Sequence, residues 1–387
     1  MLGSAFDVFR MRQYFDVIVG VRDTVEGILD DVGFLDDARR ALVSLPLDRW
    51  PAARSPFPAV GLPAASASEP RIALLATGGS GALASVVGVA RAFEEKGRRP
   101  SLISLCSGSA LFGFPIAAGI AADDVAAFAL GLRPRDYVDV DWRGLLALAP
   151  TLARGFAGIV HGDRLEATYR RLLGNMTLAE MPIPAYAPIW NVEENRVEYL
   201  GPRTYPDVTV ARAVRMAVSL PLFIQPVELD EDHWCDGGIV DIFPVIPAID
   251  LEPGSDAAVA VNGFYPPEFA GEDVRGWERR VGSIVTVGSQ VRTCQQSELA
   301  RVNLARLREA MPVAMIEPVP YEKVRGLGFY RQFLNNGEWP QFMRAGRTAG
   351  RRALESLASP TGSFVPPART RNGSFDSGRH IAPRRTL

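Results

Sequence analysis

The sequence RIALLATGGSG, residues 71–81, decides the fold of this chain. Its first half is an uninterrupted apolar run, which is typical of a strand buried on both faces of a parallel sheet. Glycines follow at once, and residues 81–97 then have the pattern of a helix. A second apolar run at 101–106 also leads into a helix, which begins near Gly108. Strand, helix, strand and helix at this spacing predict an α/β fold with a mainly parallel central sheet.

Apolar and periodic segments predict further elements along the chain. Strands are expected near residues 186–193, 196–200, 257–262, 283–287 and 313–317, and helices near 143–155, 163–174, 207–218, 294–311 and 340–357. Helical periodicity followed by a Pro/Ala-rich linker makes 1–67 an N-terminal helical extension. The Pro/Gly/Ser/Arg-rich end, 359–387, is expected to be a disordered basic tail, which leaves 68–358 as the folded domain.

Composition excludes several classes of protein. The chain has 387 residues, of which 47% are hydrophobic, so it is not a disordered chain. Its net charge of −2 gives no general affinity for nucleic acid. Its 3 cysteines lack CxxC spacing, which provides neither a disulfide framework nor a zinc site. We therefore expect no metal and no cofactor.

Residues 100–122 carry no charge and are long enough to suggest a membrane span. Gly108, Gly113, Pro115 and Gly119 interrupt this run, which favours a strand, a sharp turn and a buried helix instead. The N-terminus lacks the basic region and apolar core of a secretory signal. We expect a cytoplasmic protein without a transmembrane segment, whose N-terminal helices either pack on the domain or lie on a membrane surface as a peripheral contact.

A glycine turn, Gly78–Gly81, joins the first strand to the following helix. Backbone N–H groups at such a turn point toward one spot, where the helix dipole favours negative charge. The turn fits a phosphate site, an oxyanion hole for acyl transfer, or a tight turn without a ligand. It does not complete a GxGxxG or Walker A motif, and no acidic residue ends the second strand, which disfavours a nucleotide-binding enzyme.

The segment LCSGSA, residues 105–110, lies where the second strand meets its helix. A serine at that junction sits on a sharp turn at the carboxyl end of the sheet, where the amide of Gly108 can face the same oxyanion. Ser107 is therefore a candidate nucleophile. Cys106 and Ser109 are rivals, although alternation along a strand turns Cys106 away if Ser107 faces the site. A structural serine in a turn is the other interpretation.

Asp236-Gly237-Gly238 follows a polar turn and precedes an apolar segment. An aspartate held by two glycines can be oriented by the turn, and a carboxylate within reach of a serine hydroxyl can act as its general base. Taken alone, Asp-Gly-Gly is more often a hairpin turn.

The three motifs in this order resemble those of the patatin-like phospholipase family, a group that includes bacterial acyl hydrolases. The matching segments are 77–81 for the oxyanion loop, 106–110 for the serine elbow and 236–245 for the aspartate motif with its trailing proline. Residues 211–221 are similar to the helix that precedes the aspartate in that family. The resemblance runs from about residue 71 to 359 and implies a three-layer α/β/α sandwich.

By this resemblance the chain hydrolyses acyl esters of lipids through a Ser107–Asp236 dyad, with Ser107 as nucleophile and Asp236 as general base. The backbone N–H groups of Gly78, Gly79 and Gly108 would form the oxyanion hole. The substrate would be a lipid ester. Two apolar stretches could supply an acyl groove or belong to the core: Leu111, Phe112, Phe114 and Ile116, and Leu220–Phe223.

The sequence departs from the family at two places. The arginine or lysine that usually follows the glycine loop is replaced by Ala82 and Leu83, and the elbow lacks its first glycine. The missing cation motivates an alternative, a weak or inactive relative that binds lipid or protein. The 3 histidines, His161, His233 and His380, have no evident place in a triad, which favours a dyad.

Overall fold

The computed structural model describes residues 69–145, 156–266, 269, 284–324, 331–333 and 335–358. The predicted N-terminal extension, 1–67, and the predicted tail, 359–387, lie outside the described residues.

An eight-stranded sheet forms the centre of the molecule, with the order β10-β9-β1-β2-β4-β8-β7 and β5 paired to β4. Its strands are β1 (Ile72–Ala76), β2 (Ile103–Ser104), β4 (Ala185–Asn191), β5 (Arg196–Leu200), β7 (Val227–Leu229), β8 (Asp232–Asp236), β9 (Ala257–Val261) and β10 (Val313–Ile316). The five strands from β10 to β4 run parallel, whereas β5, β8 and β7 pair antiparallel. A small second sheet pairs β3 (Gly158–Val160) with β6 (Leu222–Ile224).

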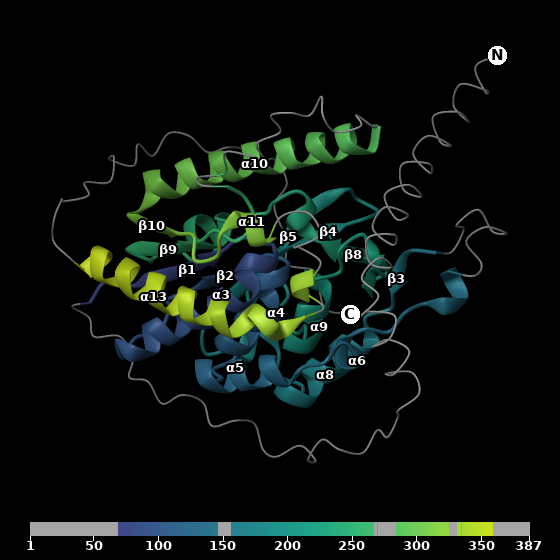
Figure 1. Cartoon of the computed structure of the whole chain (residues 1–387), viewed down its shortest axis with the longest axis horizontal. Helices are drawn as coiled ribbons and strands as arrows, with labels where there is room; N and C mark the ends of the chain where they lie inside the picture. The colour runs from purple at the N-terminus through teal and green to yellow at the C-terminus, as the bar shows by residue number, and fades with distance from the viewer. Residues whose placement is uncertain are drawn as a thin grey trace.

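Helices cover both faces of the sheet. On one face lie α3 (Ser80–Glu95), α4 (Gly108–Ala117), α5 (Ala122–Gly131) and α13 (Trp339–Ala358), and on the other α10 (Ile284–Ala310) (Figure 1). Further α-helices among the described residues are α6 (Pro134–Tyr137), α8 (Asp163–Leu173), α9 (Val210–Ala217) and α11 (Tyr321–Val324). Short 3₁₀ turns span Leu178–Glu180, Gly237–Ile239 and Asn336–Glu338, and a π turn spans Pro247–Leu251. The fold is thus the three-layer α/β/α sandwich that the family resemblance implies.

Strand β1 shows how the apolar run builds two cores. Its five residues are all buried, and successive side chains point to opposite faces. Ile72, Leu74 and Ala76 join the cluster with α3, α4 and α13, whereas Ala73 and Leu75 join the cluster that contains the buried face of α10. An apolar residue is therefore needed at every position of this strand.

One predicted strand is wrong. Residues 283–287 were expected to be extended because Ile284-Val285-Thr286-Val287 is a β-branched run, but from Ile284 the chain is the 27-residue helix α10. Local strand preference is weak, and a long packed helix overrides it. The sequence also does not predict β7 and β8, which are short and lie among polar turn residues.

The uncharged run at 100–122 is divided among β2, the turn at Ser107 and α4. Within the part of the chain that the structure describes, no helix is both long and apolar enough to cross a membrane.

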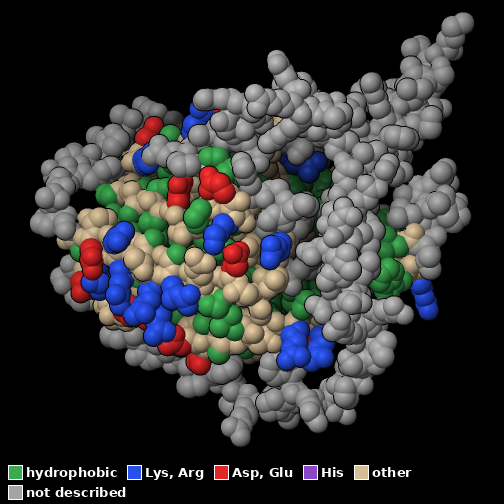
Figure 2. Space-filling view, viewed as in Figure 1, with side chains coloured by type: hydrophobic (Ala, Val, Ile, Leu, Met, Phe, Trp, Pro, Cys, Tyr) green, Lys and Arg blue, Asp and Glu red, His purple; other side chains and the backbone are tan. Residues whose placement is uncertain are grey.

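Helices α3 and α13 approach each other closely through glycines. A Cβ on Gly88 of α3 would lie 1.9 Å from the carbonyl oxygen of Met343 in α13, and one on Gly346 would lie 2.2 Å from that of Ser85. Basic side chains and carboxylates are interspersed on the surface of α13 and α3 (Figure 2). Arg351 and Glu95, for example, form an ion pair. The helix pair thus joins the two ends of the described domain.

Replacing Gly88 by alanine is expected to force α3 and α13 apart and to lower the free energy of unfolding by about 3 kcal/mol. Gly131→Ala is the matched control, because nothing lies within 4 Å of its Cβ position. Urea unfolding measures both variants. Equal stability of the two would contradict the close helix contact.

Candidate active site

Ser107 lies between β2 and α4 with a backbone that serine rarely adopts. Its φ is 48° and its ψ is −119°, and it forms the N-cap of α4. Such a positive φ on a residue with a side chain is strained and persists only when the surroundings hold it. Ser107 is half-buried, whereas its neighbours Cys106 and Gly108 are buried. The structure thus gives Ser107 the sharp strand-to-helix turn of a nucleophile elbow.

The two rival nucleophiles, Cys106 and Ser109, are both hydrogen-bonded within the protein. The Ser109 hydroxyl accepts from the Cys106 N–H and donates to the Cys106 carbonyl, both at 2.9 Å. The Cys106 thiol is fully buried and donates to the carbonyl of Asp241 at 3.6 Å. Burial, together with the carboxylates of Asp236 and Asp241, raises the pKa of this thiol well above its usual value, so its thiolate is strongly disfavoured.

Asp236, the last residue of β8, is completely buried. The Gly238 N–H donates to its Oδ1 at 2.8 Å, and its own N–H donates to the Ser219 carbonyl at 2.9 Å. The Ser107 hydroxyl donates toward the carboxyl and lowers its pKa, although Oδ2 has no partner of regular hydrogen-bond geometry in the described structure. Ser107 and Asp236 are therefore close enough for the hydroxyl to influence the protonation of the carboxyl.

Burial raises the pKa of Asp236 from 3.8 to about 7, against the opposing hydrogen bonds from Ser107 and Gly238. A carboxylate with a pKa near neutrality is a better proton acceptor than an ordinary aspartate, and it is still charged in half or more of the molecules above that pH. Cys235, the residue before it, keeps its proton because burial raises its pKa to about 12.

The three motifs meet around Cys106 and Ser107 because their glycines allow it. A Cβ on Gly78 would lie 3.1 Å from Cys106 Sγ and 3.3 Å from Ser107 Cβ, and one on Gly238 would lie 2.6 Å from Cys106 Sγ. The glycine loop and the aspartate loop therefore both pack against Cys106, and the glycine loop also packs against Ser107. A side chain at Gly238 would collide with Cys106 Sγ and crowd Asp236 Oδ1, which lies 3.0 Å from the Cβ position.

Of the three amides predicted for an oxyanion hole, one is already hydrogen-bonded within the fold. The Gly78 N–H donates to the Ile242 carbonyl at 3.0 Å and is occupied. Gly79 precedes α3, and Gly108 is the first residue of α4, so neither N–H has a partner within its helix. No hydrogen bond engages either N–H elsewhere in the described residues. The geometry leaves Gly79 and Gly108 as available donors.

The Ser80 side chain is fully buried at the first position of α3, and its hydroxyl has no partner in the part of the chain described. An unpaired buried hydroxyl typically costs about 1–3 kcal/mol. Ser80 adjoins Gly79 in the loop, so an unsatisfied donor lies beside the free amide. The sequence places Ser80 in the motif without suggesting a role for its side chain.

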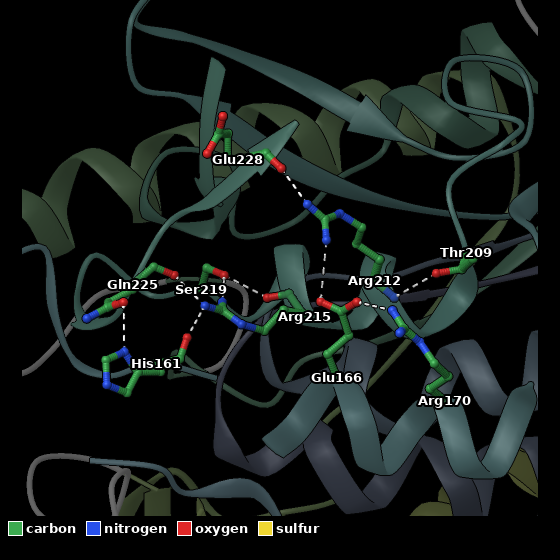
Figure 3. A network of polar contacts seen from close by, with 9 residues as sticks. All are labelled: His161, Glu166, Arg170, Thr209, Arg212, Arg215, Ser219, Gln225 and Glu228. Carbon is green, nitrogen blue, oxygen red and sulfur yellow. Dashed lines mark hydrogen bonds and ion pairs between the residues drawn. The ribbon is translucent and has the colours of Figure 1, made fainter. Parts of the chain in front are cut away.

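Arg215 in α9 supports the residues that hold Asp236 (Figure 3). Its buried guanidinium donates to the Ser219 hydroxyl and to the carbonyls of His161 and Gln225, the last at 2.7 Å. The Ser219 hydroxyl in turn donates to the Arg215 carbonyl at 2.6 Å. Because the Ser219 carbonyl accepts from the Asp236 N–H, this network fixes the backbone from which the carboxyl projects.

The described histidines contact other residues. The His161 ring lies 3.0 Å from Gln225 Oε1, and the exposed His233 pairs with Glu193 at 2.7 Å. His380 lies outside the described residues. Neither described histidine is hydrogen-bonded to Ser107 or is among the groups that shift the pKa of Asp236.

Two aromatic rings flank the available amides, and the sequence does not single them out. A Cβ on Gly79 would lie 2.6 Å from the ring of Phe264, and one on Gly108 would lie 3.2 Å from Phe333 Cζ. The expected groove residues Phe112, Phe114 and Ile116 belong to the buried core instead, and only Leu111 is partly exposed there. The described residues hold no group of three or more side chains that could bind a metal ion.

Comparison with known families identifies the domain. The sequence model of the patatin-like phospholipase family matches residues 74–249, which include the glycine loop, Ser107 and Asp236. The chain therefore carries a patatin-like phospholipase domain.

The relatives that match are uncharacterized. An NTE family protein of Mycobacterium tuberculosis and another of Mycobacterium bovis are each 29% identical over 199 residues, which is 51% of this chain and 50% of theirs. The protein YqhO of Bacillus subtilis is 26% identical over 188 residues, 42% of this chain and 61% of its own. This chain spans about half the length of the mycobacterial relatives.

Solved structures overlap the chain in part. VipD from Legionella pneumophila covers 74% of this chain and 67% of its own, with 15% identity and a TM-score of 0.41. Human GIVD cytosolic phospholipase A2 covers 74% and 62%, with 9% identity and a TM-score of 0.39. Likenesses this partial say nothing about activity.

The raised pKa of Asp236 predicts that this residue destabilises the fold at neutral pH. Between pH 4 and 7 the unfolded carboxyl is ionised while the folded one keeps its proton, so stability falls as pH rises through that window. Asp236→Asn removes this cost, which is on the order of 4 kcal/mol above pH 7. Urea unfolding of both proteins from pH 4 to 8 should show that the unfolding free energy of Asp236→Asn increasingly exceeds that of the wild type as pH rises. A constant difference would contradict the raised pKa. The pKa of Asp241, also raised by burial, affects both proteins alike.

Proposed function

We propose that this chain is a lipid acyl hydrolase that cleaves carboxylic esters through Ser107, Asp236 and an acyl-serine intermediate. The observation that carries the proposal is the strained Ser107 turn, whose hydroxyl donates toward the buried Asp236 carboxyl. The patatin-like phospholipase domain supports a lipid ester as the substrate class.

In the proposed mechanism the Ser107 oxygen attacks the ester carbonyl carbon while its proton passes to the Asp236 carboxylate. The tetrahedral intermediate then collapses, the alcohol leaves with the proton held by Asp236, and an acyl-Ser107 ester is left. Water loses a proton to Asp236 and attacks this ester, which releases the fatty acid and returns the proton to Ser107. A pKa near 7 suits Asp236 to both directions of proton transfer.

The oxyanion is assigned to the N–H groups of Gly79 and Gly108, since the Gly78 N–H is bound to Ile242. The unpaired Ser80 hydroxyl beside Gly79 is available as a third donor. This third donor would compensate for the arginine or lysine of the family, whose place Ala82 takes. The rings of Phe264 and Phe333 would form apolar walls beside the reacting carbonyl.

The second candidate function is an inactive patatin-like protein that binds lipid or a protein partner. The absence of a cation at Ala82 favours it, because one lost oxyanion donor lowers turnover about 10²–10³-fold. The two candidates differ in whether Ser107 reacts.

A fluorophosphonate probe is expected to label Ser107, because the probe reacts with an activated serine hydroxyl. Peptide mapping should locate the adduct, and Ser107→Ala and Asp236→Asn should abolish both labelling and hydrolysis of p-nitrophenyl esters. Circular dichroism verifies that the variants are folded. An unlabelled wild-type protein that leaves the esters intact would reject the hydrolase in favour of the binding protein.

Ser80→Ala separates a catalytic from a structural hydroxyl. Loss of an oxyanion donor should lower kcat at least tenfold at similar KM, while removal of an unpaired buried hydroxyl should leave stability unchanged or raise it by about 1 kcal/mol. Ser85→Ala is the control, because that hydroxyl already donates to the Gly81 carbonyl at 2.7 Å and its loss should lower stability without lowering kcat. Unchanged kcat in Ser80→Ala would remove Ser80 from the oxyanion hole.

A further inference from the structure

Helix α10 carries buried polar side chains that contact the aspartate loop. Gln296 and Asn303 are 8% and 7% exposed, although each lies on a helix face packed against the sheet. They are seven residues apart, so they project from the same side of the helix two turns from each other. The segment that matches the family ends at residue 249, and α10 lies beyond it.

Gln296 is held at both ends of its amide. Its Nε2 donates to the Gly238 carbonyl at 2.6 Å, and its Oε1 accepts from the Tyr265 hydroxyl at 2.9 Å. A donor at one end and an acceptor at the other fix which way the amide points. Gly238 is the residue whose N–H donates to Asp236 Oδ1 at 2.8 Å. Hydrogen bonds thus link Tyr265 to Gln296 and Gln296 to the Gly238 carbonyl, and the N–H of the same glycine binds the Asp236 carboxylate.

Asn303 holds the other end of the same loop. Its Nδ2 donates to Asp241 Oδ1 at 2.9 Å and to the Phe243 carbonyl at 2.8 Å. The Tyr199 hydroxyl donates to the second oxygen of Asp241 at 2.6 Å. The loop from Asp236 to Phe243 is thus tied to α10 at two points.

We propose that α10 is a clamp on the aspartate loop, in which Gln296 is a positioning residue that keeps the Gly238 N–H on Asp236 and Asn303 fixes the loop beyond it. This inference rests on the proposed function, because it assigns the clamp to the residue that acts as base there. It places part of the active-site machinery outside the segment matched by the family.

A weaker hydrogen bond from the Gly238 N–H would change the pKa of Asp236. This N–H donates to the charged form of Asp236 and lowers the pKa of that carboxyl, so a weaker bond lets burial raise the pKa further. Two titratable groups are coupled to this carboxyl, the thiols of Cys106, which follows β2, and of Cys235, in β8 itself, and the Asp236 carboxylate raises the pKa of both. Both stay protonated near neutral pH. A shift in the titration of Asp236 therefore reports on the clamp.

Gln296→Met keeps the length of the side chain and removes both hydrogen bonds. The pH–rate profile for a p-nitrophenyl ester should have its acidic limb near pH 7 in the wild type and about one unit higher in Gln296→Met, with kcat at pH 7 lowered about fivefold and KM changed less than twofold. Leu304→Ala is the matched control, since Leu304 is a buried apolar residue of the same helix. That variant should lose stability and keep the limb of the wild type.

A second measurement does not depend on turnover. The difference in unfolding free energy between a protein with Asp236 and its Asp236→Asn counterpart follows the titration of Asp236, so its upper midpoint should move up by about one pH unit in the Gln296→Met background. An inactive wild type would reject the proposed hydrolase while this titration still tests the clamp. The clamp would be overturned if Gln296→Met changed neither the acidic limb of the pH–rate profile nor the upper midpoint of the difference in unfolding free energy.

Discussion

Close contact of two glycine loops with Cys106 and Ser107 is the constraint on which the rest of the structure depends. Gly78 packs against both residues and Gly238 against Cys106, and a Cβ would collide with Ile242 at Gly78 and with Cys106 at Gly238. Strand β2 supplies the fixed end of this contact, because it lies between β1 and β4 in the parallel part of the sheet. Ligand sites of such sheets lie at the carboxyl ends of the strands, where Ser107 and the glycine turn are found.

Burial of the Asp236 carboxyl opposes stability and favours the proposed chemistry. A carboxylate removed from water binds a proton more tightly, which destabilises the folded chain at neutral pH and makes the same group a better base. The surroundings are arranged to hold it in place. Arg215 and Ser219 secure the backbone before it, and Gln296 and Asn303 secure the loop after it.

Much of the fold follows from local patterns in the sequence. The apolar run of β1 has to be buried on both faces, and the turns before α3 and α4 are given by glycines and small residues. The short strands β7 and β8 have no such pattern, and the β-branched start of α10 indicates a strand where the chain is helical. In both cases distant packing outweighs the preference of a few residues.

The sequence by itself determined the order of strands and helices around the glycine loop, and it singled out Ser107 and Asp236 as candidates. Only the tertiary structure brought these two residues together, since they are far apart in the chain and meet across β2, β4 and β8. It also decided that the Gly78 N–H is occupied by Ile242 and that Gln296 reaches the Gly238 carbonyl. Hydrogen-bond partners of this kind depend on distances between remote segments, which no local pattern of residues specifies.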